Sequence, residues 1–151
     1  GDIAQWSELL LLVGFDEWWP ERLRDKGITE PERREGSRLI VYNDRIVACT
    51  MASQHSAEPP VGALDFVSAH PDHAGKGLGN GVCAAVTQYL TGRGYEQVIL
   101  HTDDWRLPAI KTYLKMGFQP QMIEPDMPER WQKACEQLNW PYTFDGPDSP
   151  Q

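Results

Sequence analysis

The sequence predicts a mixed α+β (α/β) domain with a central, mostly antiparallel, twisted sheet flanked by helices. Three features favour this class. Apolar residues recur at helical spacing near the start, form short β-rich runs over residues 38–69, and then return in segments that alternate between helix and strand. A chain of 151 residues has the length of one domain, so we expect a single domain over residues 1–151.

The segment before the sheet is predicted to be helical. Asp2 and Gln5 have the spacing of a capping box, and an apolar stripe at helical intervals continues from them to Gly14. A second short helix is predicted after Pro20. Residues 27–37 are charged and bounded by glycine, and we expect them to form a loop or a mobile helical turn.

A β-hairpin and a third strand follow. Residues 38–42 and 45–51 are β-rich runs, and Asn43-Asp44 between them is a two-residue hairpin signal. A loop is predicted over residues 53–60, which include two consecutive prolines. Residues 61–69 are predicted to form the next strand.

Helices and strands alternate in the second half of the chain. A helix is predicted to start in a glycine-rich segment and to end at Gly92 or Gly94, and a strand is predicted over residues 97–102. The acidic pair 103–104 supplies cap acceptors for a further helix, which we expect to end at Gly117.

The last part of the chain is predicted to contain a strand, a helix and a tail. Residues 118–123 are the expected strand. Asp126 and Pro128 are a strong helix start, because they place a cap and a first-turn proline before an apolar face. We therefore expect a C-terminal helix and tail over residues 124–151.

Charge and composition exclude several function classes. The net charge is −8 and no basic patch is concentrated in the sequence, so we expect neither nucleic acid nor a membrane surface as a partner. No apolar run approaches the roughly 18 residues of a membrane span, and no secretory signal is visible. Cys49, Cys83 and Cys135 are scattered, which argues against a disulfide framework or a metal site and favours a cytoplasmic protein.

The segment AGKGLGNG, residues 74–81, is the strongest chemical signal. Its four glycines let backbone N–H groups converge, and the following helix adds unpaired donors and a positive dipole end, a combination that binds phosphate groups. Gly77 after Lys76 breaks the Walker pattern, and Asn80 and Val82 break the dinucleotide pattern. A glycine-rich turn without a ligand is the alternative.

Two motifs resemble those of the GNAT N-acetyltransferase superfamily. Residues 68–79, SAHPDHAGKGLG, are similar to its acetyl-CoA signature, in which a strand and a His-Pro-type turn lead into Arg/Gln-x-x-Gly-x-Gly/Ala. Residues 108–118, PAIKTYLKMGF, resemble its second motif, a helix that ends in Tyr-x-x-x-Gly-Phe. The motifs occur in the family's order and spacing, and the resemblance implies an acetyl-CoA-binding core over about residues 61–120.

The sequence departs from the family pattern at three places. Ala74 stands where the family usually has Arg or Gln, and Arg106 stands where an Asn often opens the second motif. The family usually has a strand before its first helix, and none is predicted here. The resemblance implies that backbone amides carry most of the phosphate binding, with Lys76 and Arg106 adding charge. A homodimer in which a partner supplies the strand is a further hypothesis.

The resemblance implies acetyl-CoA as the acyl donor and an amine as the acceptor. The strand over residues 61–69 would lie beside the pantetheine arm, and its backbone N–H groups near residues 67–69 would polarise the thioester carbonyl. The residues expected to bind acetyl-CoA are Val67, Ser68, Ala69, Gly75, Lys76, Gly77, Leu78, Gly79, Asn80 and Arg106.

The resemblance also implies catalytic roles. Tyr113 matches the family's general acid, and a phenol with an ordinary pKa of about 10 suits the reprotonation of a thiolate. Asp65 lies on the key strand and is the candidate general base, although its position equally fits a surface carboxylate. His70 and His101 are alternative bases, because imidazoles titrate near neutral pH.

The sequence thus predicts an enzyme that transfers the acetyl group of acetyl-CoA to a primary amine of a small molecule or peptide, by direct transfer in a ternary complex. Trp6, Trp18 and Trp19 either line an acceptor pocket or pack against the sheet. Two other functions stay open: a catalytically silent acyl-CoA-binding or regulatory module, and a phosphate-binding fold of another kind, such as a nucleotide binder.

Overall fold

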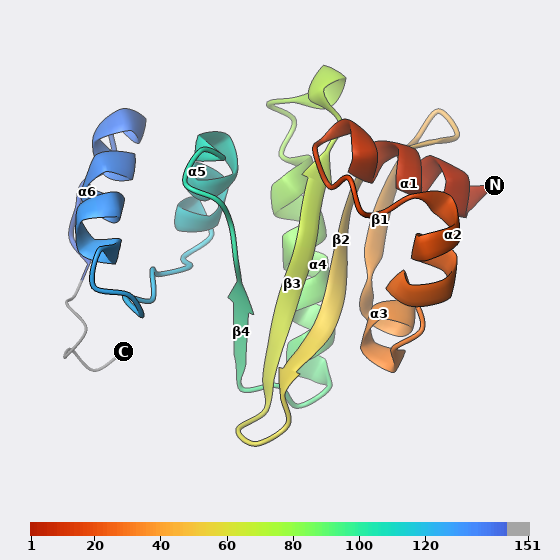
Figure 1. Cartoon of the computed structure of the whole chain (residues 1–151), viewed down its shortest axis with the longest axis horizontal. Helices are drawn as coiled ribbons and strands as arrows, with labels where there is room; N and C mark the ends of the chain where they lie inside the picture. The colour runs from red at the N-terminus through yellow and green to blue at the C-terminus, as the bar shows by residue number, and fades with distance from the viewer. Residues whose placement is uncertain (145–151) are drawn as a thin grey trace. The chain divides into compact units, whose positions relative to one another are not determined.

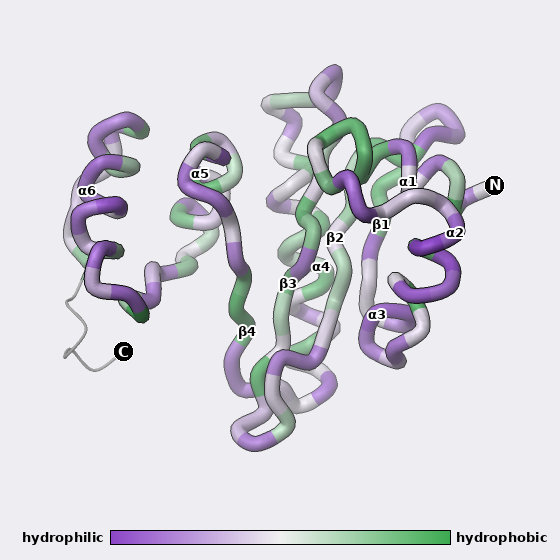
Figure 2. Tube along the Cα trace, in the orientation of Figure 1, coloured by the Kyte–Doolittle hydropathy of each residue, from purple (hydrophilic) through white to green (hydrophobic). Residues whose placement is uncertain are grey.

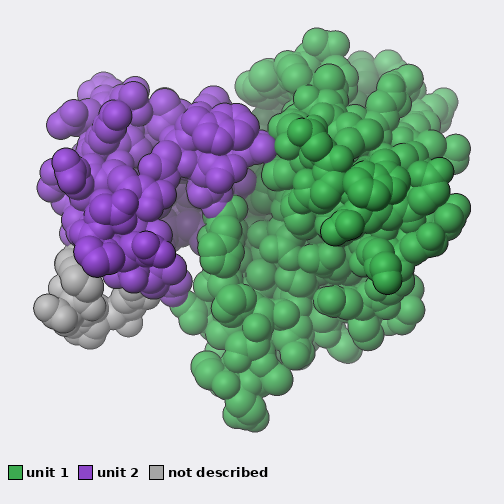
Figure 3. All heavy atoms as spheres, in the orientation of Figure 1, with its two compact units in different colours: residues 1–101 green, residues 102–151 purple. Residues whose placement is uncertain are grey.

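The computed structural model describes residues 1–144, and residues 145–151, at the end of the predicted C-terminal tail, lie outside the described residues. The chain divides into two compact units, residues 1–101 and 102–151, which Figure 3 shows in different colours. The predicted core over residues 61–120 has residues in both. In chain order the first unit holds α1 (Asp2–Leu12), α2 (Pro20–Arg22), a π-helical turn (Leu23–Gly27), α3 (Pro31–Gly36), β1 (Arg38–Tyr42), β2 (Arg45–Ser56), β3 (Val61–Ala69), a 3-10 turn (Pro71–His73), α4 (Leu78–Gly92) and β4 (Gln97–Leu100), and the second holds α5 (Leu107–Lys115) and α6 (Met127–Leu138).

The strands of the first unit form one sheet in the order β1-β2-β3-β4. The β1–β2 and β2–β3 pairs are antiparallel and the β3–β4 pair is parallel, which confirms the predicted mostly antiparallel sheet. Asn43 and Asp44 have φ angles of 48° and 60°, as a type I′ hairpin turn requires, so the hairpin is confirmed. β2 continues to Ser56, past the predicted start of the loop, because Ser53 pairs with Ala63 of β3.

Helices cover both faces of this sheet, and the core lies between them (Figure 1). On one face, Gly62 of β3 lies directly against Leu90 of α4. On the other face, Met51 of β2 packs into a buried cluster with Leu9 and Leu10 of α1. Figure 2 shows hydrophobic residues along β2 and β3, and a mostly hydrophilic α3. The predicted helix that follows the glycine-rich segment is confirmed as α4 and ends at Gly92.

The predicted stripe on the first helix is confirmed, but its predicted cap is wrong. Gly1 is the N-cap of α1, Asp2 is the first helical residue, and the helix makes no side-chain cap bond. Gln5 instead joins the helix to the β1–β2 hairpin: its side-chain N–H donates to the Asp44 carbonyl oxygen (3.1 Å), and its side-chain oxygen accepts from the Ile46 N–H (3.0 Å). Gln5 therefore bonds to the distant hairpin instead of forming the local capping box with Asp2.

The segment over residues 27–37, predicted to be a loop or a mobile helical turn, contains a short helix, α3, that is packed against the rest of the unit. Pro31 sits in its first turn, where the fixed proline φ angle suits a helix and the missing N–H leaves no bond unmade. Gly36, its last residue, is buried and lies directly against the Tyr89 ring of α4 and the side chain of Ala52 in β2. Only glycine permits this close approach, so α3 is held by packing that local sequence does not reveal.

The second unit departs from two predictions. The strand expected over residues 118–123 is absent from the described residues, because the Phe118 N–H turns back to the Tyr113 carbonyl oxygen (3.1 Å) and Gly117, with φ 96°, closes α5. The acidic pair does not cap α5, since Arg106 holds the N-cap position. Asp104 instead makes two bonds to Arg130 of α6 (2.7 and 2.8 Å), and these bonds lower the pKa of Asp104.

Within residues 1–144, no helix is both long enough and apolar enough to cross a membrane. The three cysteines Cys49, Cys83 and Cys135 are buried free thiols. The described residues also contain no group of three or more His, Cys, Asp or Glu side chains arranged to hold a metal ion.

Gly36→Ala tests the packing of α3. The added Cβ would lie 2.8 Å from the Ala52 Cβ and would meet the Tyr89 ring, so we expect the free energy of unfolding to fall by about 1–3 kcal/mol. Gly92→Ala is the matched control, because a Cβ there meets nothing within 4 Å, and we expect it to be neutral or slightly stabilising. Urea unfolding measures both, and equal stability of the two variants would contradict this packing.

Candidate functional site

One edge of β3 is open over half of its length. β4 pairs with β3 only from Val61 to Leu64, and within the described residues the stretch from Asp65 to Ala69 pairs on the β2 side alone. A strand edge without a partner presents backbone N–H and C=O groups that a ligand can bind. A 3-10 turn (Pro71–His73) connects the open edge to the glycine-rich segment.

β3 also carries a β-bulge in this stretch. Asp65 pairs with Met51 and Ser68 pairs with Cys49, so β3 has one more residue than β2 between the two pairs. The extra residue is accommodated at Phe66, whose φ of 55° is left-handed and costs roughly 1–2 kcal/mol for a non-glycine residue. Its ring stacks edge-on against two aromatic rings of the α1–α2 region, Phe15 and Trp18, each with centroids 5.1 Å away. Such contacts contribute about 0.5–1.5 kcal/mol each, enough to offset the strain.

The direction of the backbone N–H groups on β3 follows from its pairing. The His70 N–H donates to the Val47 carbonyl oxygen (2.8 Å), and hydrogen-bonded and non-hydrogen-bonded pairs alternate along an antiparallel ladder. The N–H of Ser68 therefore faces β2, whereas those of Ala69 and Val67 point to the open edge. Of the three residues predicted to bind the thioester, the geometry leaves Val67 and Ala69 with available N–H groups.

The glycine loop joins the open edge to the N-terminus of α4. Gly75 and Gly77 have φ angles of 78° and 73°, which L side chains rarely adopt, and Gly77 is the N-cap of α4. The Gly81 N–H bonds back to the Gly77 carbonyl oxygen (3.0 Å). The N–H groups of residues 78–80 precede that bond and have no acceptor within the helix. Together with the helix dipole, they form a cradle for an anion.

Space around the loop is open at its glycines. A Cβ added at Gly75, Gly77 or Gly79 would meet no protein atom within 4 Å. Glycine at the first two positions is explained by their positive φ angles. Gly79 has an ordinary φ, and its missing side chain leaves the space above the α4 N-terminus clear.

Basic and aromatic side chains gather beside the loop. The Lys76 Nζ lies 3.4 Å from His73 Nδ1 and 5.8 Å from the centre of the Tyr42 ring, and the Tyr42 and His73 rings are 5.5 Å apart. Lys76 is exposed. Lys76 thus places one ammonium group beside the loop, which suits an anionic ligand.

The remaining predicted residues of the second motif lie in the second unit. Tyr113 is buried in α5 together with Ile110 and Leu114, and its ring contacts Phe118 at 6.4 Å between centroids. The central guanidinium carbon of Arg106 lies 4.3 Å from the centre of the Trp105 ring, and its Nε lies 3.5 Å from Asp103 Oδ2.

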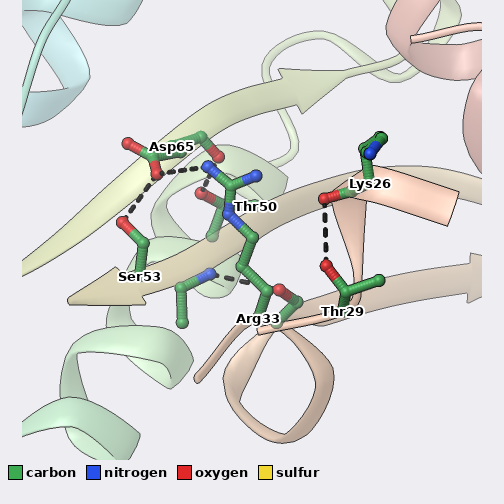
Figure 4. Close-up of polar contacts among 8 residues, drawn as sticks. Lys26, Thr29, Arg33, Thr50, Ser53 and Asp65 are labelled. Atoms are coloured by element: carbon green, nitrogen blue, oxygen red, sulfur yellow. Dashed lines mark hydrogen bonds and ion pairs between the residues drawn. The ribbon is translucent and has the colours of Figure 1, made fainter. Parts of the chain in front are cut away.

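Asp65, the candidate base, is held by a small polar network (Figure 4). It pairs with Met51, whose side chain belongs to the α1 cluster, so the carboxylate lies on the α1 face of the sheet. Its Oδ2 accepts from the Ser53 hydroxyl (2.7 Å) and the Arg33 guanidinium (3.2 Å), and its carbonyl oxygen accepts from the Thr50 hydroxyl (3.0 Å). Sequence reasoning missed Arg33 and Ser53: only the β2–β3 register could have indicated Ser53, and nothing local indicated Arg33.

The alternative bases and the tryptophans are also placed. His70 Nδ1 accepts from the Asp72 N–H (3.1 Å) as the cap of the 3-10 turn, which is a structural role. His101 is exposed after β4, with its ring 6.3 Å from that of His55. Of the tryptophans predicted to line a pocket or pack on the sheet, Trp6 and Trp18 are buried in the α1 cluster and Trp19 is 47% exposed.

The comparisons with known proteins agree with this geometry. A family model described as the Acetyltransferase (GNAT) family matches residues 3–118. The chain therefore belongs to the GNAT acetyltransferase family, and the resemblance predicted from the two motifs is confirmed. Family membership removes the alternative of an unrelated nucleotide-binding fold.

Among curated relatives, the mycothiol acetyltransferase of Saccharomonospora viridis is 38% identical over 125 residues, which are 74% of this chain and 40% of that protein. The chain thus spans about two fifths of the relative's length. The solved structure of an acetyltransferase from Trypanosoma brucei matches with a TM-score of 0.60 at 24% identity, over 82% of this chain and 89% of that one. An aminoglycoside N-acetyltransferase in complex with CoA matches with a TM-score of 0.65 at 18% identity, over 78% and 82%. These two likenesses establish the fold.

The cysteines are unsuited to act as nucleophiles. Burial raises the pKa of Cys49 and of Cys83 to about 12, and burial also raises the pKa of Cys135. The thiolate is the reactive form of cysteine, and it is scarce at neutral pH for all three side chains. An acetyl-cysteine intermediate is therefore disfavoured.

Alkylation tests this assignment of the cysteines. We expect the folded protein to resist iodoacetamide at about pH 8.5, a pH at which an ordinary cysteine is half ionised, because all three thiols are buried and protonated. Mass spectrometry after labelling, with urea-unfolded protein as the fully reactive control, gives the result. Rapid labelling of any one cysteine in the folded protein would contradict it.

Proposed function

We propose that the protein is an N-acetyltransferase that moves the acetyl group of acetyl-CoA to a primary amine of a small molecule or peptide, directly, within a ternary complex. One observation carries the proposal: the bulged, open edge of β3 runs into the glycine loop that begins α4, in a chain of the GNAT family. The CoA complex of the aminoglycoside N-acetyltransferase of the same fold supports acetyl-CoA as the donor. The reduced, buried thiols favour a cytoplasmic location.

In the proposed complex, the diphosphate of acetyl-CoA accepts hydrogen bonds from the glycine-loop and α4 N–H groups, residues 75–80, and the pantetheine arm lies along the open edge of β3. The N–H groups of Val67 and Ala69 would donate to the thioester carbonyl oxygen and stabilise the oxyanion of the tetrahedral intermediate. Lys76 would add charge beside the diphosphate, and Arg106 remains a proposed contact.

The proposed reaction needs two proton transfers. The neutral amine attacks the thioester carbon, a C–N bond forms, and the C–S bond breaks. Asp65, directly or through a water molecule, takes the proton that the nitrogen loses, and Tyr113 gives its phenolic proton to the departing CoA thiolate. The products are an amide and CoA, and proton exchange with water restores both side chains. The unreactive cysteines support this direct route over a covalent one.

A catalytically silent acyl-CoA-binding module is the second candidate. It is favoured by Ala74, which supplies no side chain where the family usually has Arg or Gln. The two candidates differ in turnover alone. Release of CoA from acetyl-CoA over a panel of amines decides between them: turnover with one amine class supports the enzyme, and tight binding without turnover supports the silent module.

Tyr113→Phe tests the general acid. We expect kcat for the best amine to fall by roughly 100-fold, because the thiolate loses its proton donor, while the Kd for acetyl-CoA stays unchanged. Tyr95→Phe is the matched control. It also removes a phenolic hydroxyl, but Tyr95 bonds to Gln54 and precedes β4, at the end of β3 that lies away from the glycine loop. Equal kcat values for the two variants would contradict the role of Tyr113.

Gly79→Glu tests the diphosphate cradle. The side chain has room, and an acid in the first turn suits the helix dipole, so we expect the fold to keep its stability. The carboxylate would repel the diphosphate, and a like charge at this range weakens acetyl-CoA binding by roughly tenfold relative to Gly79→Gln, the neutral variant of the same shape. Isothermal titration calorimetry measures both Kd values. Equal affinities would place the diphosphate elsewhere.

A further inference from the structure

We infer that Arg33 is a positioning residue for the acceptor side of this reaction: it holds the Asp65 carboxylate in the orientation that meets the incoming amine. The inference rests on the proposed function and adds to it a side chain from outside both family motifs. Arg33 lies in α3, a helix whose last residue packs against β2 and against Tyr89 of α4, and its guanidinium reaches Asp65 on the α1 face of the sheet.

The carboxylate is held on one oxygen. The Ser53 hydroxyl and the Arg33 guanidinium both donate to Asp65 Oδ2, at 2.7 and 3.2 Å, from β2 and from α3. The side chains of Arg33 and Asp65 are 17% and 26% exposed, so the pair is largely shielded from water. Two donors on Oδ2 fix the side-chain rotamer of Asp65, and Oδ1 points away from both of them in Figure 4. Oδ1 is then the oxygen available to an acceptor.

The guanidinium itself lies beside two aromatic rings, one of which belongs to the bulge residue Phe66. Its central carbon lies 6.0 Å from the centre of the Phe66 ring and 5.9 Å from that of Trp18. Phe66 is the left-handed residue of the bulge and is followed by Val67, whose N–H points to the open edge. Arg33 therefore contacts both the Asp65 carboxylate and the bulge residue Phe66, next to the Val67 N–H that would bind the thioester oxygen.

The two substrates must approach the reacting carbon from different sides. The acyl donor would occupy the open edge of β3 and the α4 N-terminus, so the amine has to arrive from the α1 face, where Asp65 lies. As the C–N bond forms, positive charge develops on the nitrogen, and a carboxylate oxygen at a fixed position stabilises that charge and accepts the proton. A freely rotating carboxylate would do this less often.

Glu32, the residue next to Arg33 in α3, offers a matched control for the Arg33 variants. Glu32 anchors the same helix on the α4 side: it accepts from the Tyr89 hydroxyl (2.9 Å), and its carboxylate lies 3.6 Å from Arg93. Glu32→Gln weakens the attachment of α3 without touching Asp65. An effect that came only from loosening α3 would appear in Glu32→Gln as well as in an Arg33 variant.

The test compares Arg33→Met, Arg33→Lys and Glu32→Gln by steady-state kinetics and thermal unfolding. We expect Arg33→Met to lower kcat/KM for the amine by roughly 10- to 100-fold, with the Kd for acetyl-CoA within about twofold of wild type. Arg33→Lys should recover most of that loss, because the contact with Asp65 is a single N–O pair that an ammonium can also make. Glu32→Gln should lower the Tm but leave kcat/KM within about twofold of wild type.

Three results would overturn the inference alone: Arg33→Met with wild-type kcat/KM, equal losses in Arg33→Met and Glu32→Gln, or no recovery in a folded Arg33→Lys. If instead the wild-type protein binds acetyl-CoA but acetylates no amine, the proposed function fails and the inference fails with it. The kinetics of the wild type therefore separate the two failures.

Discussion

The extra residue that β3 inserts opposite β2 is the constraint on which the site depends. In a regular strand, neighbouring side chains point to opposite faces, but the bulge lets Asp65 and Phe66 both face the α1 side. The Phe66 ring then anchors the strained backbone among aromatic residues, and Asp65 meets Arg33 and Ser53. Directly after the bulge the strand resumes its alternation along an edge that β4 has left open. One inserted residue thus places a carboxylate and a row of N–H groups side by side.

Backbone donors also reconcile the charge of the protein with the ligand we propose. A chain with a net charge of −8 repels anions at long range. Its glycine loop and helix N-terminus supply fixed partial positive charges that require no surplus of lysine. Lys76, close to His73 and Tyr42, concentrates one full positive charge beside the loop. The acidic remainder of the surface favours a cationic second substrate, as an amine is at neutral pH before it releases a proton to solvent and becomes the neutral nucleophile.

What the sequence predicts well is chemistry that the backbone decides locally. The hairpin at residues 43–44 and the glycine loop need φ angles that few residues adopt, so their composition is diagnostic. Predictions failed where a side chain bonds to a residue far away in the sequence. Gln5 binds the hairpin instead of capping α1, and Asp104 binds an arginine of α6 instead of capping α5. Arg33 could not be found, because the helix that carries it depends on close packing against a tyrosine of α4 rather than on a local signal. The family motifs indicated the proposed donor side of the site, and tertiary structure was needed to propose the acceptor side.

The central claim is that backbone amides of β3 and the glycine loop bind acetyl-CoA. Titration of ¹⁵N-labelled protein with acetyl-CoA, followed by amide NMR, tests it most directly. We expect the largest chemical-shift changes on Val67, Ala69 and residues 75–80, with small changes on the β1 edge and α3. Saturable binding whose shifts lie elsewhere and leave these amides unmoved, or the absence of binding at millimolar acetyl-CoA, would contradict the account.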